Sequence, residues 1–299
     1  MNKVVWTEWD DLKIPSNIVG LSLVNTPINS GNFSEITFFV PKYEEGTPTF
    51  KLIEKMPNLE VLQLVSAGFE DALKYLKPGV ILCNGRGIHN ESTAELAVGL
   101  TISSLRNFPE FTRNQSRKTW VHSREQSLYG KRIGILGYGA IGSTVGRMLS
   151  GFKCEVIPIS KTGKSNTFSV NHLDEILPTL DVLILILPLT KDSENLMNEK
   201  RLSLMKDGSL LVNVARGAIV DSEALIKELQ KGRLRAALDV TVPQPLPSKH
   251  PLWDAPGVFI SPHVGGNSSA FEPQAKKFLE SQLIKYSKDQ PLDNVVAVG

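Results

Sequence analysis

A short glycine pattern, GYGAIG at residues 137–142, constrains the fold more than any other feature of the sequence. An apolar run at residues 131–136 precedes it, and an apolar-periodic segment follows it to Met148, so the pattern lies in a strand–turn–helix unit. In such a unit the first glycine permits the tight turn, the second lets the backbone approach a pyrophosphate, and the third lets the helix pack closely on the strand. The helix N-terminus offers free N–H groups to phosphates. The pattern therefore predicts a dinucleotide-binding site.

Further apolar runs continue this second part of the chain. With the strand at 131–136 they make six predicted strands, the others being 155–159, 182–187, 210–214, 234–239 and 258–260. Helices are expected between them, for example at 198–205 and 222–230. Strands that alternate with crossovers of helical length are typical of a doubly wound parallel sheet.

The first part of the chain has a similar but smaller pattern. Strands are predicted at residues 4–7, 19–24, 35–40, 59–65 and 79–84, with helices near 49–55 and 71–76. A long helix is expected from Ser92 to Leu105, and Pro109 ends its periodicity. The more polar stretch 111–126, which contains Trp120, is interpreted as an arm or linker. The predicted fold class is α/β, in two parts.

Composition excludes several classes of function. A length of 299 residues suits two domains, and a net charge of +2 with interspersed signs argues against a nucleic-acid-binding or polybasic membrane surface. The two cysteines, Cys83 and Cys154, lie in apolar runs and are interpreted as reduced core residues, with no disulfide framework and no metal site. No apolar stretch reaches the ~18 residues of a membrane helix, and no signal-peptide pattern follows Met1, so a cytoplasmic protein is expected.

The residues after the second strand of the later part bear on the choice of dinucleotide. An NAD site usually places Asp or Glu about 20 residues after the glycine pattern, where it holds the ribose 2′-hydroxyl. Here Ser160 occupies that position, beside Lys161 and Thr162, and no acid is present. A hydroxyl and an ammonium favour a 2′-phosphate, which a carboxylate would repel. The sequence predicts NADP(H) in preference to NAD(H); the alternative is that these are solvated loop residues.

Three later segments each follow a predicted strand of the same sheet: NVARG at 213–217, DVTVPQPLP at 239–247 and SPHVGG at 261–266. Ligands bind at the carboxyl edge of an open α/β sheet, so Arg216, a polar partner and His263 are expected to converge there. A guanidinium stays charged and donates in a planar fork, and an imidazole titrates near neutral pH. This combination favours chemistry on a small acid.

Together these segments make the chain similar to the D-isomer-specific 2-hydroxyacid dehydrogenase family, which includes D-lactate dehydrogenases and glyoxylate/hydroxypyruvate reductases. The resemblance covers nearly the whole chain. The matching pieces are SAGF at 66–69, TAE at 93–95, residues 130–142, LPLT at 187–190, residues 213–221, ALDV at 237–240 and PHVGG at 262–266.

The resemblance implies an architecture. It implies two Rossmann/flavodoxin-like domains with doubly wound parallel sheets and the active site in the cleft between them. Residues 1–98 with 267–299 would form the substrate-binding (lid) domain, and residues 99–266 the dinucleotide-binding domain. The helix after Glu95 and the arm through Trp120 resemble the family's dimer contact, so a homodimer is expected.

The resemblance also implies roles for individual residues. Arg216 would bind the substrate carboxylate and polarise the 2-oxo group, and His263 would act as general acid in reduction and general base in oxidation. The backbone N–H groups of Ala67 and Gly68 resemble the family's carboxylate cradle. The implied cofactor contacts are Gly137, Gly139, Ala140, Ile141, Gly142, Ser160, Lys161, Thr162, Leu187, Pro188, Val214, Ala215, Asp239, His263 and Gly265.

One position departs from the family. Most members have a Glu that pairs with the catalytic histidine, and the matching residue here is Gln244. Formate dehydrogenases, which are distant members, also use Gln. A glutamine orients the ring but supplies no full charge, so His263 is expected to lose its proton at a lower pH than in Glu-bearing relatives. The alternative is an enzyme that has lost activity.

The substrate is less constrained. Arg86 and His89 follow a strand of the first part and either favour a second polar or acidic group on the substrate or are solvated loop residues. Glyoxylate or hydroxypyruvate is favoured, because an NADP-type loop suggests reduction. The alternative function is a nucleotide-sensing corepressor or scaffold with little turnover. A metal-dependent alcohol dehydrogenase lacks a set of Cys and His ligands.

Overall fold

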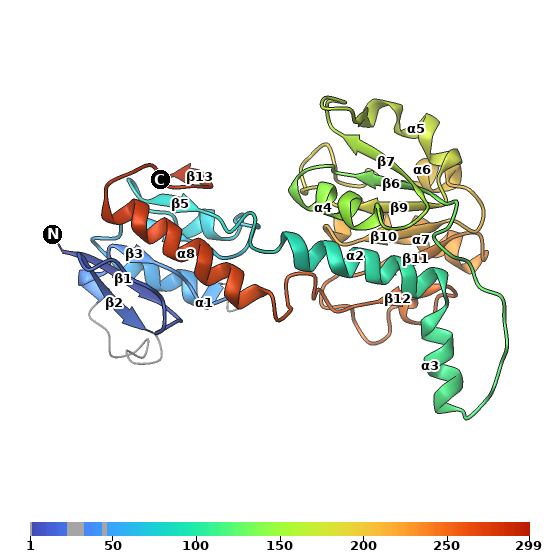
Figure 1. Ribbon diagram of the computed structural model, residues 1–299, viewed down its shortest axis with the longest axis horizontal. Coiled ribbons are helices and arrows are strands. Elements are labelled where there is room, and N and C mark those ends of the chain that lie inside the picture. Colours follow the sequence, from blue (N-terminus) through green and yellow to red (C-terminus); the bar gives the residue numbers. More distant parts are fainter. Residues whose placement is uncertain (1, 23–32, 44–46) are drawn as a thin grey trace. The chain divides into compact units, whose positions relative to one another are not determined.

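The computed structural model describes residues 2–22, 33–43 and 47–299. It divides the chain into two units, Met1–His89 with Ser269–Gly299, and Asn90–Ser268 (Figure 1). Each unit has one sheet of mainly parallel strands with helices packed against it. The predicted fold class is therefore confirmed.

The sheet of the first unit has the strand order β13-β5-β4-β3-β1-β2. Its strands are β1 (Lys3–Thr7), β2 (Ile18–Ser22), β3 (Phe38–Phe39), β4 (Val61–Gln63), β5 (Ile81–Cys83) and β13 (Val295–Val298). The order 2-1-3-4-5 is that of flavodoxin-like sheets, and β13 is added antiparallel to β5. The strand expected at 19–24 begins one residue earlier, and its last two residues lie outside the described residues.

Alternate residues of these strands face two different cores. Val5, Phe38 and Val61 pack with residues of helix α8 (Phe271–Ser287), which crosses one face of the sheet (Figure 1). Their neighbours Trp6 and Phe39 pack on the other face with the short helices. Those helices are η1 (Phe33–Glu35), α1 (Thr47–Phe50), η2 (Lys51–Lys55) and η3 (Ala72–Tyr75).

The sheet of the second unit has seven parallel strands in the order β12-β11-β10-β9-β6-β7-β8. They are β6 (Arg132–Leu136), β7 (Glu155–Ser160), β8 (Phe168–Ser169), β9 (Val182–Leu185), β10 (Leu210–Asn213), β11 (Arg235–Leu238) and β12 (Val258–Ile260). This is the Rossmann order 3-2-1-4-5-6 with β12 added, so the switch point lies between β6 and β9. All six predicted strands of this unit are present, and the edge strand β8 is additional.

Helices cover both faces of this sheet. They are α2 (Asn90–Leu105), α4 (Ala140–Leu149), α5 (Leu173–Ile176), α6 (Glu199–Leu204) and α7 (Ser222–Gln230), with 3-10 turns at Val170–His172, Leu177–Thr179, Gly217–Ile219 and Pro251–Trp253. Helix α3 (Phe108–Ser116) has no buried residue and projects away from the sheet (Figure 1). Helices α2 and α4 lie side by side and share one core with Ile133 and Ile184 (Figure 1). Leu183 and Leu185 face the opposite core with α6 and α7.

Helix α2 sets the limit of the second unit. Ala94, Ala97 and Leu100 are buried in one cluster with Ile133 and Val212, so the whole helix packs on the second sheet. The chain passes between units at 89/90 and 268/269, whereas the sequence-based boundary after residue 98 falls inside this helix.

The stretch interpreted as an arm is partly helical. Helix α3 begins at Phe108, and Pro109 lies in its first turn, where the missing N–H removes no helical hydrogen bond. Pro109 therefore starts a second helix. Beyond α3, the side chain of Trp120 is 95% exposed.

Both cysteines are free thiols. Cys83 is buried, and burial raises the pKa of its thiol to about 12. Cys154 is only half-buried. No helix in the described ranges is both long and apolar enough to cross a membrane.

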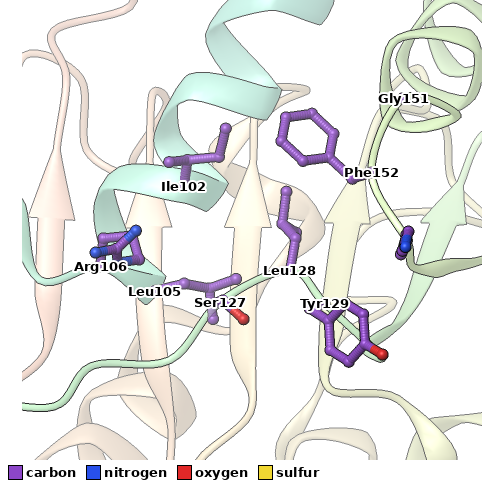
Figure 2. A pocket seen from close by; sticks show the side chains of 9 residues that line it. Ile102, Leu105, Arg106, Ser127, Leu128, Tyr129, Gly151 and Phe152 are labelled. Carbon is purple, nitrogen blue, oxygen red and sulfur yellow. The ribbon is translucent and has the colours of Figure 1, made fainter.

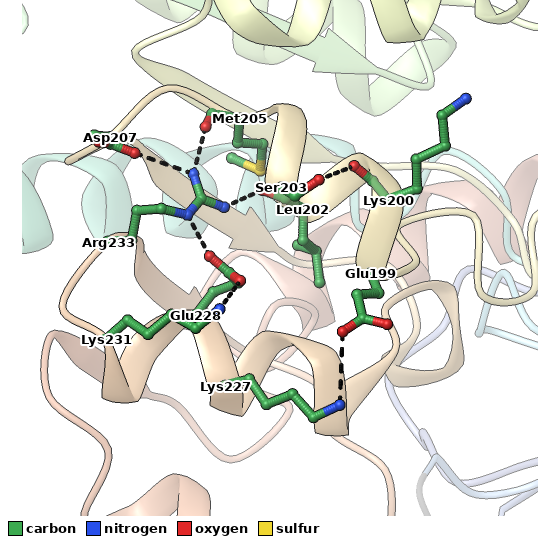
Figure 3. A network of polar contacts seen from close by, with 10 residues as sticks. All are labelled: Glu199, Lys200, Leu202, Ser203, Met205, Asp207, Lys227, Glu228, Lys231 and Arg233. Carbon is green, nitrogen blue, oxygen red and sulfur yellow. Dashed lines mark hydrogen bonds and ion pairs between the residues drawn. The ribbon is translucent and has the colours of Figure 1, made fainter.

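An arginine network ties α6 and α7 to the start of β11 (Figure 3). Arg233 pairs with the buried carboxylate of Glu228 and donates to the carbonyl oxygens of Leu202 and, at 2.6 Å, Met205. Lys231 also contacts Glu228, at 2.9 Å, from a more exposed position. Burial raises the pKa of Glu228, but the hydrogen bonds from Lys231 and Arg233 outweigh it, so the net direction is downward.

Replacing Arg233 by methionine is expected to lower the free energy of unfolding by about 2–4 kcal/mol, because it leaves two carbonyls without this donor and the buried carboxylate of Glu228 with Lys231 alone. Since folding lowers the pKa of Glu228, its stabilising contribution is present above the unfolded value near 4.5 and is lost as the pH falls. Urea unfolding at pH 7 and pH 4 measures both effects. Lys231→Met, the control, should cost under about 1 kcal/mol; equal losses for the two variants would contradict the assignment.

Candidate active site

The glycine pattern forms the turn between β6 and α4. Gly137 has a φ of +103°, and a Cβ there would collide with the carbonyl group of Ile186 at the end of β9. A Cβ on Gly142 would collide with the carbonyl oxygen of Gly137. Packing within the protein therefore requires glycine at both positions.

Gly139 is different, because no described atom lies within 4 Å of the position a Cβ would take. Its φ of −91° is also accessible to any residue. Gly139 precedes helix α4, and no described side chain caps the N-terminus of that helix. The helix end thus keeps N–H groups of Ala140 and Ile141 beside open space, which suits the close approach of a phosphate.

Arg216 follows β10. The Asn213 side chain holds this turn, donating to the carbonyl oxygen of Arg216 at 3.0 Å and accepting from the N–H of Ala215 at 3.0 Å. The guanidinium is exposed and donates to the carbonyl oxygen of Ala215 at 2.8 Å. The hydrogen bond found for the guanidinium among the described residues is this one to a carbonyl, so its remaining donors are available to an anion.

Asp239 follows β11 and holds the segment that carries His263. Its carboxylate is 2% exposed and accepts hydrogen bonds from Ser261 Oγ at 2.6 Å, Val264 N at 2.9 Å and Gly265 N at 3.0 Å. The N–H of His263 donates to the backbone oxygen of Asp239 at 2.8 Å. His263 itself has a φ of +55°, so these bonds fix a left-handed backbone. Asp239, expected as a cofactor contact, directs its carboxylate to this loop.

His263 and Gln244 lie in contact. Gln244 Nε2 is 2.5 Å from His263 Nδ1, and both side chains are exposed. In this orientation the Gln244 amide N–H donates to His263 Nδ1, so the hydrogen of a neutral ring lies on Nε2. If the amide is turned over, its oxygen accepts a hydrogen bond from a protonated Nδ1. The pairing predicted for Gln244 is therefore present in the geometry, with either end of the amide able to face the ring.

Strand order brings the arginine and the histidine to one edge. β10, β11 and β12 are neighbours, so the residues after each strand lie at the same carboxyl edge of the sheet. A Cβ on Gly217 would collide with the backbone of Thr241, so the turn of Arg216 packs against the loop of Gln244. That loop in turn contacts His263. The remaining predicted cofactor contacts of these loops follow β9 and β10: Leu187, Pro188, Val214 and Ala215.

The predicted 2′-phosphate residues end β7. Ser160 Oγ lies 2.6 Å from Thr167 Oγ1 and accepts from Gly163 N at 3.1 Å, so its hydroxyl shapes the loop. Lys161 and Thr162 are exposed. The Lys161 ammonium is 2.8 Å from Asp192 Oδ2, a carboxylate that the sequence alone did not suggest.

In the first unit, Ala67 and Gly68 follow β4, and Arg86 follows the neighbouring strand β5. The buried side chain of Asn84 joins the two loops, donating to Ala67 O at 2.8 Å and accepting from Arg86 N at 3.2 Å. The Arg86 side chain is exposed. His89 is buried, bonds Val65 O through Nε2 at 3.0 Å and stacks on Phe271, so it belongs to the core of this unit.

Comparison with known proteins decides the family. Residues 98–265, more than half of the chain, match the family described as D-isomer specific 2-hydroxyacid dehydrogenase, NAD binding domain. The chain belongs to the D-isomer specific 2-hydroxyacid dehydrogenase family. It is therefore an oxidoreductase-family protein with an NAD-binding domain, as the sequence motifs predicted.

Several relatives are named glyoxylate reductase. That of Thermofilum pendens is 34% identical over 255 residues, covering 80% of this chain and 75% of its own, and that of Pyrococcus furiosus is 33% identical over 259 residues, covering 80% and 76%. A family member of known structure from Aeromonas salmonicida has 24% identity, a TM-score of 0.88 and full coverage of both chains. An NADPH-dependent glyoxylate/hydroxypyruvate reductase from Sinorhizobium meliloti, solved with NADP and malonate, has 21% identity and a TM-score of 0.77, covering 99% of this chain and 97% of its own. The two structures show the shared dehydrogenase fold.

The structure adds residues that motif analysis of this dehydrogenase missed. Ser92 and Thr93, at the start of α2, donate to the carbonyl oxygen of Gly265 at 2.7 and 3.1 Å, and so brace the His263 loop in addition to Asp239. Thr93 belongs to one of the family-like segments. A hydroxyl that supports a loop from a distant helix leaves no local spacing signal, so only the fold reveals it.

One cavity of the second unit lies away from these residues (Figure 2). It has a volume of about 350 Å³ and includes Leu128 and Tyr129, which precede β6, and Lys153, which precedes β7. It is therefore at the amino edge of the parallel sheet. Ligands of such sheets bind at the carboxyl edge, so this cavity is not part of the candidate site.

Proposed function

We propose that this family member is an NADP(H)-dependent 2-ketoacid reductase that acts on glyoxylate or hydroxypyruvate. One observation carries the proposal. The exposed guanidinium of Arg216 and the imidazole of His263, which contacts Gln244, lie at the same carboxyl edge of the sheet as the glycine turn. The names of the relatives that are glyoxylate reductases support the same substrate class.

The residues present fit a dinucleotide. The N-terminus of α4 and the open space at Gly139 suit the pyrophosphate, and the backbone after β9 and β10 suits the rest of the molecule. When bound, the nicotinamide supplies or accepts the hydride. We propose the same cofactor contacts as the sequence predicts, except that the Asp239 carboxylate acts by holding the His263 loop.

The chain's own residues divide the remaining work. Arg216 binds the substrate carboxylate and polarises the 2-oxo group through its fixed fork of donors. His263 holds a proton at Nε2 and delivers it to the developing alkoxide oxygen, and in oxidation it takes that proton back. Gln244 keeps the ring oriented through Nδ1. Ala67, Gly68 and Arg86 are the proposed substrate contacts of the first unit, Arg86 favouring a second polar or acidic group.

The decisive test is a panel of 2-keto acids assayed with NADPH and with NADH, following absorbance of the reduced nucleotide. Turnover of glyoxylate or hydroxypyruvate, faster with NADPH, is the expected result. Tight NADPH binding without turnover of any keto acid would instead support a nucleotide-sensing corepressor or scaffold. Faster turnover with NADH would remove the proposed role of Ser160, Lys161 and Thr162.

We also propose that the enzyme is a cytoplasmic homodimer. The exposed apolar side chains of helix α3 and the arm, Phe108, Phe111, Trp120 and Val121, support an interface there, because aromatic residues are enriched at protein contacts. Sedimentation velocity measures the oligomeric state of the purified native chain and of the Trp120→Ala variant directly.

Replacing Gln244 by glutamate is expected to shift the alkaline limb of the reduction pH–rate profile upward by about one pH unit. A carboxylate within reach of Nδ1 stabilises the protonated ring, and reduction needs that proton. Keto-acid reduction by the native enzyme and the variant, measured from pH 5 to 10, gives the shift. Gln290→Glu, on the surface of the first unit, is the control for added charge. If the alkaline limb of Gln244→Glu stays where it is in the native enzyme, the contact between residue 244 and His263 does not set the pH dependence of reduction.

A further inference from the structure

An ion pair spans the predicted 2′-phosphate region. Lys161 Nζ lies 2.8 Å from Asp192 Oδ2, and the two side chains are 78% and 74% exposed. The hydrogen bond from Lys161, with its charge, lowers the pKa of the Asp192 carboxyl. The Asp192 carboxylate is thus ionised at neutral pH. It binds the Lys161 ammonium, the same group that we propose as a contact of the cofactor 2′-phosphate.

The pair connects loops on the two sides of the glycine turn. Lys161 follows β7 and Asp192 lies in the segment after β9, while β6, which carries the glycine turn, lies between those strands. The ion pair therefore reaches across the carboxyl end of β6. This is the region in which sheets of this order hold a dinucleotide.

Asp192 lies on an ordered turn. Ser193 Oγ accepts from Thr190 N at 2.7 Å and donates to Pro188 O at 2.7 Å, and Asn195 N donates to Ala218 O at 2.8 Å. These bonds keep the carboxylate beside Lys161.

We propose that Asp192 is a specificity-determining residue that lowers the affinity for NADP(H) relative to NAD(H) by competing with the 2′-phosphate for Lys161. The inference rests on the proposed function, in which Lys161 contacts that phosphate. To bind NADP(H), the ammonium must exchange Asp192 for the phosphate, and the carboxylate then faces a second anion. To bind NAD(H), the Lys161–Asp192 pair need not open.

Asp192→Asn removes the competing charge and keeps the size of the side chain. Because exposed pairs are weak, we expect the Kd for NADPH to fall about two- to fivefold, with the Kd for NADH unchanged. The same difference is expected between adenosine 2′,5′-bisphosphate, which carries the 2′-phosphate, and 5′-AMP, which does not. Isothermal titration calorimetry measures all four constants without turnover.

Glu194→Gln is the matched control, since it removes a charge from the same loop where no cation contacts the side chain among the described residues. Equal gains for Asp192→Asn and Glu194→Gln would overturn the proposal in favour of a general field effect. So would an NADPH Kd unchanged within about 1.5-fold, or an equal gain for NADH.

A further variant separates this inference from the proposed function. If Lys161→Met weakens NADPH and not NADH, the proposed phosphate contact stands, and Asp192→Asn alone decides the competition. If Lys161→Met leaves both constants unchanged, the phosphate contact fails, and the inference fails with it. In the Lys161→Met background the Asp192→Asn substitution should lose most of its effect.

Discussion

Arg216→Gln is expected to lower kcat/KM for glyoxylate or hydroxypyruvate about 10²–10³-fold, with the Kd for NADPH nearly unchanged. The guanidinium is the exposed cation after β10, and its donors beyond the bond to Ala215 O are open to a carboxylate and a 2-oxo group. Glutamine keeps hydrogen-bonding capacity but loses the charge and the fork. Steady-state kinetics and NADPH titration measure the two quantities.

Two further variants sharpen this result. Arg216→Lys restores the charge without the planar fork, so it should recover only part of the activity. Arg106→Gln removes an exposed arginine from the opposite edge of the same sheet and should leave kcat/KM within about twofold. Native-like activity of Arg216→Gln would refute the proposed substrate contact.

His263→Asn is expected to lower kcat about 10²–10⁴-fold, because the proton donor is lost. Asparagine is the appropriate replacement, since His263 has a φ of +55° and asparagine tolerates that region better than most residues. In the native enzyme the rate of reduction should fall as rising pH removes the ring proton, and in the variant this dependence should disappear. A pH–rate profile of kcat tests both.

The control is His122→Asn, an exposed histidine after helix α3. It should keep the native rate and profile. NADPH binding by His263→Asn should persist, which would show that its loop remains folded. A residual pH dependence identical to that of the native enzyme would assign the proton to another group.

Much of the fold was predictable because its signals are local. The apolar runs that became β6, β9 and β10 are buried on both faces, and such strands need no long-range information to be recognised. The two-residue strand β8 has too little sequence for any period. Pro109 was misread as the end of the helical stretch because proline is equally compatible with the first turn of a new helix.

The residues of the candidate site could be predicted from the sequence, but the hydrogen bonds and ion pairs that join them could be predicted less well. Glycine spacing and strand ends identified the turn at Gly137 and the loops of Arg216 and His263. The roles of Asp239 and Asn84 depend on carboxylate and amide bonds to loops distant in sequence. The sequence indicated that Lys161 is a cation free to bind a phosphate, because its partner, Asp192, is 31 residues away and gives no local signal.

The first unit is discontinuous, and this affects how the protein is made. Its core needs Leu279 and Leu283 of α8, and β13 covers the edge of β5. During translation the whole of residues 90–268 leaves the ribosome before these pieces do. The second unit can therefore fold first. Until β13 is synthesised, the edge of β5 is unpaired, and unpaired strand edges promote aggregation. We expect nascent chains stalled before α8 to be the state most dependent on chaperones.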